Sequence, residues 1–217
     1  MRFETTAAVL FVVSAYAAVI AGAEYLRRRG WPALMTRKSA HAAGALVSCA
    51  LPVFISRTAA ISIGGGASLL LWATGRNNML RGIHDGGRDS AGAVLFPAGL
   101  ALSALFFWKS DAAVFQWSAL LFGLADGVAG AGGEMLGRRN YSLTGPKTLE
   151  GSLLCLAASV LVLAAFVQVQ RGFGGAWDVA AVAAGALAVT AVESALGKGW
   201  DNVGVPVAGG AVLLLLR

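Results

Sequence analysis

The sequence predicts an all-α membrane protein: a polytopic transmembrane helical bundle of about eight spans, forming one integral membrane domain over residues 1–217. Charged residues make up 13% of the chain and hydrophobic residues 57%, whereas soluble domains carry about 25% charged residues. Glycine contributes 29 residues, which suits helices that approach closely in lipid. This composition excludes a disordered chain, a disulfide scaffold and a nucleic-acid-binding domain.

Apolar runs define the individual spans, because a membrane helix needs about 20 mostly apolar residues. Three consecutive glycines, Gly64–Gly66, predict a bend in the third span, and the last span is short and contains Pro206. The first run looks like a signal peptide, but the positive charge of Arg27–Arg29 just after it resists translocation, so we expect this span to be retained. The predicted spans are 6–26, 39–56, 58–75, 91–108, 112–133, 150–170, 177–196 and 202–216.

The loops between these spans differ in charge. Twelve of the 17 Lys and Arg residues fall on one predicted side of the membrane. Because membrane proteins concentrate Lys and Arg in their cytoplasmic loops, the charge-rich loops are predicted to be cytoplasmic and both termini to lie outside. Cys49 and Cys155 lie within apolar runs and are expected to be small core residues rather than a disulfide or metal pair.

Two basic stretches lie on the predicted cytoplasmic side. The first contains Arg37, Lys38 and His41, of which Arg37 and His41 are four residues apart and share one helix face. The second runs from residue 76 to residue 92 and includes Arg88. Taken alone, the first also fits simple interfacial anchoring, and the second also fits a solvated loop.

Asp126 carries the strongest functional signal, because it begins a glycine-rich stretch well inside an apolar run. An ionised Asp at a helix centre costs roughly 2.5–3.5 kcal/mol on insertion scales. A chain seldom retains that cost without a partner cation, a metal or a wet cavity. Ala129, Gly133 and Gly137 follow one another at intervals of four, and this stripe by itself is typical of helix packing.

The loop after this span leads to Lys147 through a Gly-Pro turn, with Glu150 and Ser152 at the start of the next helix. A lysine beside the N–H groups of a helix start suits a phosphate. The spacing is not that of a Walker A loop. A capping role for Thr148 or Ser152 is the alternative.

The last polar stretch contains Glu193, near the end of the seventh span, and Asp201 and Asn202, at the start of the eighth. Carboxylates on the same predicted side as these cations can hold Mg²⁺, which usually keeps substrate phosphates as partners, and cations neutralise the remaining phosphate charge. The sequence therefore predicts a magnesium-phosphate site at the cytoplasmic interface. The apolar body around it would admit a lipid whose head group lies at that interface.

Together these stretches resemble the membrane-bound CTP-dependent lipid kinases: dolichol kinase, phytol and farnesol kinase, and the CTP-using diacylglycerol kinase. They are more distantly similar to phosphatidate cytidylyltransferase. The resemblance covers about residues 36 to 210. It rests on R-K-x-x-H from Arg37, D-x-x-A-x-x-x-G-x-x-x-G from Asp126, K-[ST]-x-E-G-S from Lys147, and an element from Glu193 to Asn202 that is followed by Pro206.

The resemblance implies an enzyme that transfers the γ-phosphoryl group of CTP, with Mg²⁺, to a membrane-embedded isoprenoid alcohol such as phytol, farnesol, dolichol or another polyprenol. The catalytic residues that it implies are Asp126, Lys147 and His41. The implied metal ligands are Asp126, Glu150, Glu193 and Asp201. The implied nucleotide- and phosphate-binding residues are Arg37, Lys38, Arg88, Gly133, Gly137, Ser152 and Asn202.

Two alternatives belong to other classes: a cytidylyltransferase that forms a CDP-lipid, and a non-catalytic lipid transporter. Transporters often contain internal repeats, and no convincing repeat relates residues 1–110 to residues 111–217. The concentration of charged and polar residues on one predicted side of the membrane also disfavours transport. The sequence does not select one acceptor alcohol, because apolar residues that line lipid pockets are interchangeable. The glycine stripe could pack helices within one chain or between two copies, so a homo-oligomer is also possible.

Overall fold

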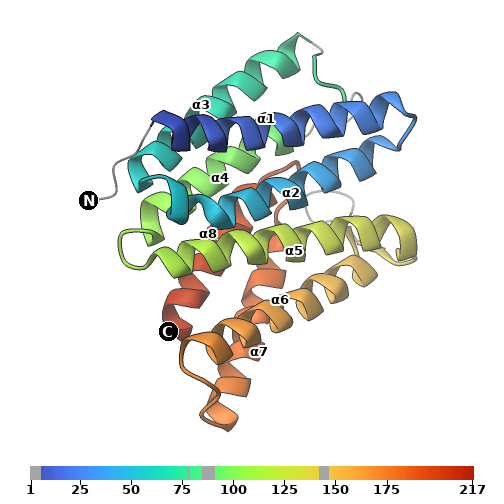
Figure 1. The fold of residues 1–217 in the computed structure, drawn as a ribbon. Helices are drawn as coiled ribbons and strands as arrows, with labels where there is room; N and C mark the ends of the chain where they lie inside the picture. Colours follow the sequence, from blue (N-terminus) through green and yellow to red (C-terminus); the bar gives the residue numbers. More distant parts are fainter. Residues whose placement is uncertain (1–5, 78, 85–90, 142–146) are drawn as a thin grey trace.

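A computed structural model of the protein, shown in Figure 1, describes residues 6–77, 79–84, 91–141 and 147–217. This part of the chain is all-helical, as the sequence predicts, apart from one pair of two-residue strands. The strands β1 (Asn140–Tyr141) and β2 (Lys147–Thr148) pair in antiparallel fashion. The helices are α1 Thr6–Arg28, α2 Ala33–Phe54, α3 Arg57–Arg76, α4 Gly92–Phe107, α5 Ala112–Leu136, α6 Leu149–Gln170, α7 Ala176–Ala195 and α8 Asp201–Leu216.

Each predicted span corresponds to one helix, but α2 begins at Ala33 rather than at residue 39. The apolar-run criterion stops at Arg37 and Lys38, whereas both residue types are good helix formers and extend the helix. Pro32 directly precedes α2. The glycines Gly64–Gly66 do not interrupt α3, which is one helix from Arg57 to Arg76.

Five helices are long and apolar enough to cross a membrane: α1, α3, α5, α6 and α7. The helices α4 and α8 are apolar but shorter, at 16 residues each. Large apolar side chains cover the outside of the bundle; Leu69 is 70% exposed and Leu161 is 71% exposed. Such a surface suits hydrocarbon rather than water, so the helices have the character of a multi-pass membrane protein.

The helix α5 lies at the centre and packs against α2, α6 and α8. Around it, α1 packs on α2, α3 on α4, α4 on α8, and α7 on both α6 and α8. The largest apolar cluster surrounds α5 and includes Phe122, Leu163 and Phe166, all fully buried. Cys155 is also a free thiol within this cluster, as expected for a small core residue, and Cys49 packs against it, also as a free thiol.

The two ends of the bundle differ in chemistry. The start of α1 and the end of α8 lie at one end, at the left of Figure 1, which we call the terminal end. There Arg217 pairs with Asp111 at 3.3 Å, and Arg57 donates to the carbonyl groups of Ala104 and Leu105. The other end holds the α1–α2 turn and the β1–β2 pair.

Candidate functional site

A cavity of about 1030 Å³ lies between α1, α2, α3, α4, α5 and the first residues of α8. Pockets for small ligands usually measure about 300–1,000 Å³, so this one is large. Its wall is apolar over most of its length and charged at one end. The charged and polar side chains at that end are Arg37, Lys38, His41, Asp126, Glu134, Asn140, Lys147, Thr148, Ser152, Glu193, Lys198, Asp201 and Asn202.

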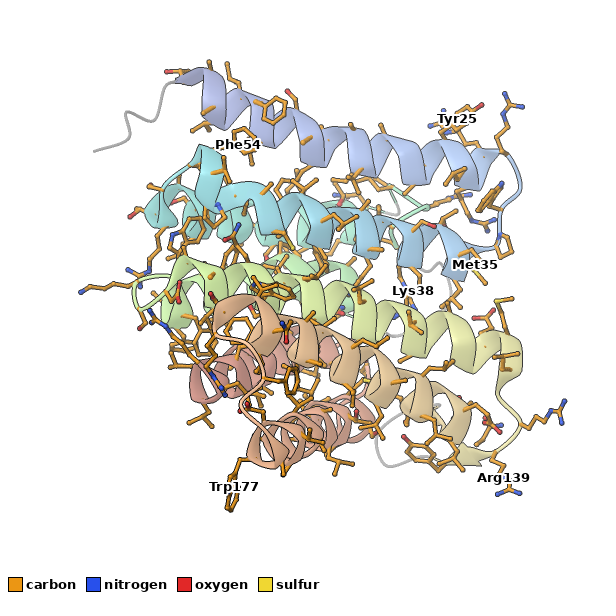
Figure 2. All side chains as sticks on the ribbon, turned by 60° about the horizontal axis from the view of Figure 1, so that its bottom comes forward. Tyr25, Met35, Lys38, Phe54, Arg139 and Trp177 are labelled. Carbon is orange, nitrogen blue, oxygen red and sulfur yellow. The ribbon has the colours of Figure 1, made fainter. Side chains whose placement is uncertain are left out.

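Asp126 is buried within α5 and is 3% exposed. The Lys38 ammonium lies 2.8 Å from its Oδ2 and also donates to its backbone carbonyl at 3.1 Å. Figure 2 shows Lys38 between α2 and α5, toward the end of the bundle that carries Arg139 and away from Phe54. Lys38 therefore supplies the partner cation that an intramembrane aspartate requires.

His41 lies on the second side of the same carboxylate, with Nε2 3.3 Å from Asp126 Oδ2. Its ring packs edge-on against Phe96 and Phe122, with centroids 4.8 Å and 4.3 Å apart. The carbonyl group of Phe122 lies 3.4 Å from the same Nε2 atom. These contacts hold the imidazole in one orientation beside Asp126.

Lys147 forms a second ion-pair centre. Its ammonium lies 2.5 Å from Glu193 Oε1 and 3.0 Å from Asp201 Oδ2, and thereby ties β2 to α7 and α8. Burial of the ammonium acts to lower the pKa of Lys147, but the carboxylates of Asp201 and Glu193 outweigh burial and raise this pKa above its ordinary value. The neighbouring carboxylates therefore favour the charged form of Lys147.

Asp126, Glu193 and Asp201 form a carboxylate trio whose ligand oxygens all lie within 4.8 Å of one another. They come from α5, α7 and α8. Oxygens on opposite sides of a Mg²⁺ ion lie about 4.2 Å apart, because each Mg–O bond is about 2.1 Å. These hard oxygen donors are of the kind that Mg²⁺ prefers, so Asp126, Glu193 and Asp201 are the residues that could hold this ion.

Glu150 is the one predicted metal ligand that the structure does not bring to the trio. Its carboxylate accepts from the backbone N–H groups of Arg138 and Arg139, at 3.1 Å and 3.3 Å. It lies in the first turn of α6 and joins that turn to the segment that follows α5. The spacing of the K-T-L-E-G-S sequence did not reveal this geometry, because Lys147 lies in β2 and Glu150 in the first turn of α6, so the two side chains do not share one helix face.

The predicted phosphate-binding residues are distributed unevenly. Arg37 lines the cavity together with Lys38, and Arg88 lies outside the described residues. The Ser152 hydroxyl lies 3.0 Å from that of Ser194. Asn202 donates to the Gly92 carbonyl at 2.7 Å and so joins α8 to α4.

Gly133 and Gly137 allow α5 and α6 to meet closely. A side chain at Gly133 would contact the Thr148 hydroxyl and Gly151, and one at Gly137 would also collide with Thr148. Thr148 caps α6 by accepting from the Gly151 N–H at 3.1 Å, as the capping alternative predicts. These glycines therefore position the segment that carries Lys147, and only Gly133 of the two lines the cavity.

Gly130 belongs to the site and was not recognised from the sequence. A Cβ atom at this position would collide with Cε and Nζ of Lys38, so the glycine leaves room for the lysine to reach Asp126. The available signal was its spacing, because Gly130 follows Asp126 by four residues and shares its helix face. Phe96, which holds His41, had no comparable signal beyond its place in an apolar span.

The fold and the site define a class: a helical membrane protein with buried ion pairs at one end of a long apolar cavity. No protein-family model, no curated protein and no solved structure matches the chain. The class therefore rests on the geometry alone.

Proposed function

We propose that this protein is a membrane-embedded kinase that transfers the γ-phosphoryl group of CTP to a lipid alcohol of the isoprenoid class. One observation carries the proposal. The carboxylate trio, drawn from three helices, meets Lys38 and Lys147 at the charged end of a cavity that is otherwise apolar. A site that joins metal ligands, phosphate-binding cations and a hydrocarbon pocket suits phosphoryl transfer to a lipid better than it suits transport.

The side chains of the site suit a divalent cation with a nucleotide. Three carboxylates lie beside the ammonium groups of Lys38 and Lys147. Asp126, Glu193 and Asp201 would hold Mg²⁺, which neutralises charge on the phosphates and orients them. Lys38, Lys147 and Arg37 would bind the phosphate oxygens from the surrounding wall.

The remaining chemistry is positioning and proton transfer. The acceptor hydroxyl oxygen bonds to the γ-phosphorus while the bond from that phosphorus to the bridging oxygen breaks, and CDP leaves with the bonding electron pair. The hydroxyl proton passes to the carboxylate of Asp126, which Lys38 and His41 hold in place at 2.8 Å and 3.3 Å from its Oδ2 atom. Such transfer depends on alignment and charge neutralisation more than on covalent catalysis.

The proposal includes the membrane arrangement. All eight helices lie within or across the bilayer, both termini lie outside, and the charged end of the cavity faces the cytoplasm, where CTP is available. The support is the uneven placement of Lys and Arg, twelve of which fall on this side.

The decisive experiment incubates purified protein with Mg-CTP and a panel of lipid alcohols, and identifies the products by mass. A lipid monophosphate released with CDP supports the kinase. A CDP-lipid released with pyrophosphate would instead identify a cytidylyltransferase. Absence of product with every alcohol and with CTP, ATP, GTP and UTP would contradict both enzyme functions.

A further inference from the structure

The apolar part of the cavity lies between α1 and α3, which cross in the view of Figure 1, and it extends toward the terminal end of the bundle. Val12 of α1 and Ala60 of α3 belong to one buried cluster at that end. Ala23 of α1, Leu71 of α3 and Ile83 form another cluster at the opposite end. Between these two clusters the helices are separated by the cavity, and we call this space the α1–α3 wedge.

Small residues of both helices line the wedge among larger apolar ones. The helix α1 contributes Ala17, and α3 contributes Gly66 and Ala67. Gly66 lines the cavity, and a Cβ atom there would meet nothing within 4 Å. Helices in lipid commonly use such small residues to pack tightly, whereas here no helix among the described residues packs against Gly66.

The wedge has a closed lower end and an apolar wall. Four buried residues, all between 0% and 6% exposed, form the floor: Leu51, Ala60, Ala104 and Phe115. Higher on the wall, the Tyr16 hydroxyl lies 2.7 Å from that of Ser48, which itself donates to the Gly44 carbonyl. This hydrogen-bonded chain engages both hydroxyl groups, so the wall offers hydrocarbon contacts to an occupant.

The depth of the wedge matches one leaflet of a bilayer. His41 at the charged end and Leu51 at the floor are ten residues apart on α2, which corresponds to about 15 Å. The hydrocarbon core of a bilayer is about 30 Å thick, so the wedge is half as deep. A tail that occupied it would place its terminal hydroxyl beside Asp126 and His41.

We propose that the α1–α3 wedge binds the hydrocarbon tail of the acceptor alcohol, an inference that rests on the proposed function. The floor of the wedge then limits the acceptor to a single-chain alcohol about one leaflet long. Geranylgeraniol and phytol fit this limit. Long polyprenols and two-chain diacylglycerol exceed it, because the floor is closed and the wedge is one continuous space. The wedge thus determines acceptor length, while the charged end carries out the chemistry.

Adjacent glycines offer a matched test. Gly66 lines the wedge, and Gly65 does not, although a Cβ atom at either position meets nothing within 4 Å. Gly66→Leu should fill the wedge about 9 Å above Ala60, since the two are six residues apart on α3. Gly65→Leu adds the same side chain outside the wedge, and leucine favours a helix more than glycine does, so both variants should fold.

The first readout is phosphorylation of prenol, a five-carbon alcohol, and of geranylgeraniol. Gly66→Leu leaves about 6 Å of the wedge above the new side chain, which is room for prenol and not for geranylgeraniol. It should reduce kcat/KM for geranylgeraniol by about tenfold or more while prenol changes much less, because one methylene group in a hydrocarbon pocket already changes kcat/KM by roughly 10–200-fold. Gly65→Leu should match the wild type on both alcohols. Equal kinetics for the two variants, or efficient turnover of long polyprenols by the wild type, would overturn the length limit.

The second readout does not depend on turnover. Geranylgeraniol with a photoreactive diazirine at its tail end is bound to the full-length protein in detergent, and the labelled peptides are mapped by mass spectrometry. We expect labels at Leu51, Ala60 or Phe115, reduced by Gly66→Leu but not by Gly65→Leu. Labels confined to the lipid-facing surface would overturn the tail site. Labels at the floor without phosphorylation by any nucleotide would support the tail site and contradict only the kinase.

Discussion

The Lys38 side chain of α2 contacts Asp126 of α5. Its ammonium lies 2.8 Å from the Asp126 carboxylate and 3.1 Å from the backbone carbonyl of the same residue. One side chain thus satisfies both acceptor groups of an aspartate that would otherwise be costly in the membrane. The contact also joins two neighbouring helices at the charged end of the cavity. It provides the basis for the first two predictions.

Asp126→Asn should abolish turnover while the protein stays folded. The amide keeps the size of the carboxylate but removes the charge that faces Lys38 and His41, and we expect a loss of about 10²–10³-fold or more, as for other pre-organised polar groups. Activity is measured with Mg-CTP and geranylgeraniol, and folding by size-exclusion chromatography. Asp111→Asn is the control, because Asp111 caps α5 at the opposite end and asparagine caps helices equally well. An active Asp126→Asn variant would exclude this site.

Gly130→Ala should lower both activity and stability. The added methyl group collides with the Lys38 side chain, so the ammonium must shift away from Asp126. Breaking a buried ion pair costs about 3–5 kcal/mol, which exceeds the about 0.8–1.0 kcal/mol by which alanine favours a helix over glycine. Gly127→Ala is the matched control on the same helix, since its Cβ atom meets nothing within 4 Å. Activity and melting temperature are measured for both variants. Equal activity in the two would show that Lys38 need not occupy this position.

The Lys147 ion pairs should stabilise the fold up to alkaline pH. Lys147→Gln leaves Glu193 and Asp201 without their partner, and removing one member of a buried pair costs about 3–5 kcal/mol. Because the folded pKa of Lys147 is raised, this stabilisation is complete below the unfolded value of about 10.4 and is lost only as pH rises further. The difference in melting temperature between the wild type and Lys147→Gln should therefore stay constant from about pH 7 to 9.5.

The control for that series is Lys109→Gln, which changes a lysine in the α4–α5 turn at the terminal end. We expect no comparable loss of stability from it, because exposed charges contribute about 0–1 kcal/mol. A difference for Lys147→Gln that already declines near neutral pH would contradict the raised pKa.

Magnesium should raise the melting temperature of the wild-type protein through the carboxylate trio. Binding to the folded state alone stabilises it by about 2.7 kcal/mol when the ion is at a hundred times its Kd. A Glu193→Gln/Asp201→Asn double variant should lose the shift. Asp178→Asn should keep it, because Asp178 pairs with Arg171 away from the site. An unchanged shift in the double variant would place the ion elsewhere.

Membrane orientation can be measured by cysteine labelling. Cys49 and Cys155 are replaced by alanine, and Ser110→Cys or Arg139→Cys is introduced at an exposed position. An impermeant maleimide added to intact cells should label position 110 and should reach position 139 only after the membrane is opened. Labelling of both positions, or the reverse order, would contradict the proposed topology.

The sequence by itself determined the helices and the segregation of charge. Helix formation and membrane insertion depend on local runs of apolar residues, so each predicted span became one helix, and the shift at the start of α2 arose where Arg37 and Lys38 continue a helix beyond its apolar run. Asp126 was identifiable from its sequence alone, because a carboxylate inside an apolar run is costly wherever the neighbouring helices lie.

Only the tertiary structure decided which side chains meet. Glu150 lies next to the Lys147 segment in sequence but caps the backbone after α5, whereas Glu193 and Asp201 come from distant helices and lie beside Lys147. The clearance at Gly130 and the closed floor of the α1–α3 wedge likewise depend on how helices pack. Distances between helices are set by side-chain packing over the whole bundle, and no local sequence pattern encodes them.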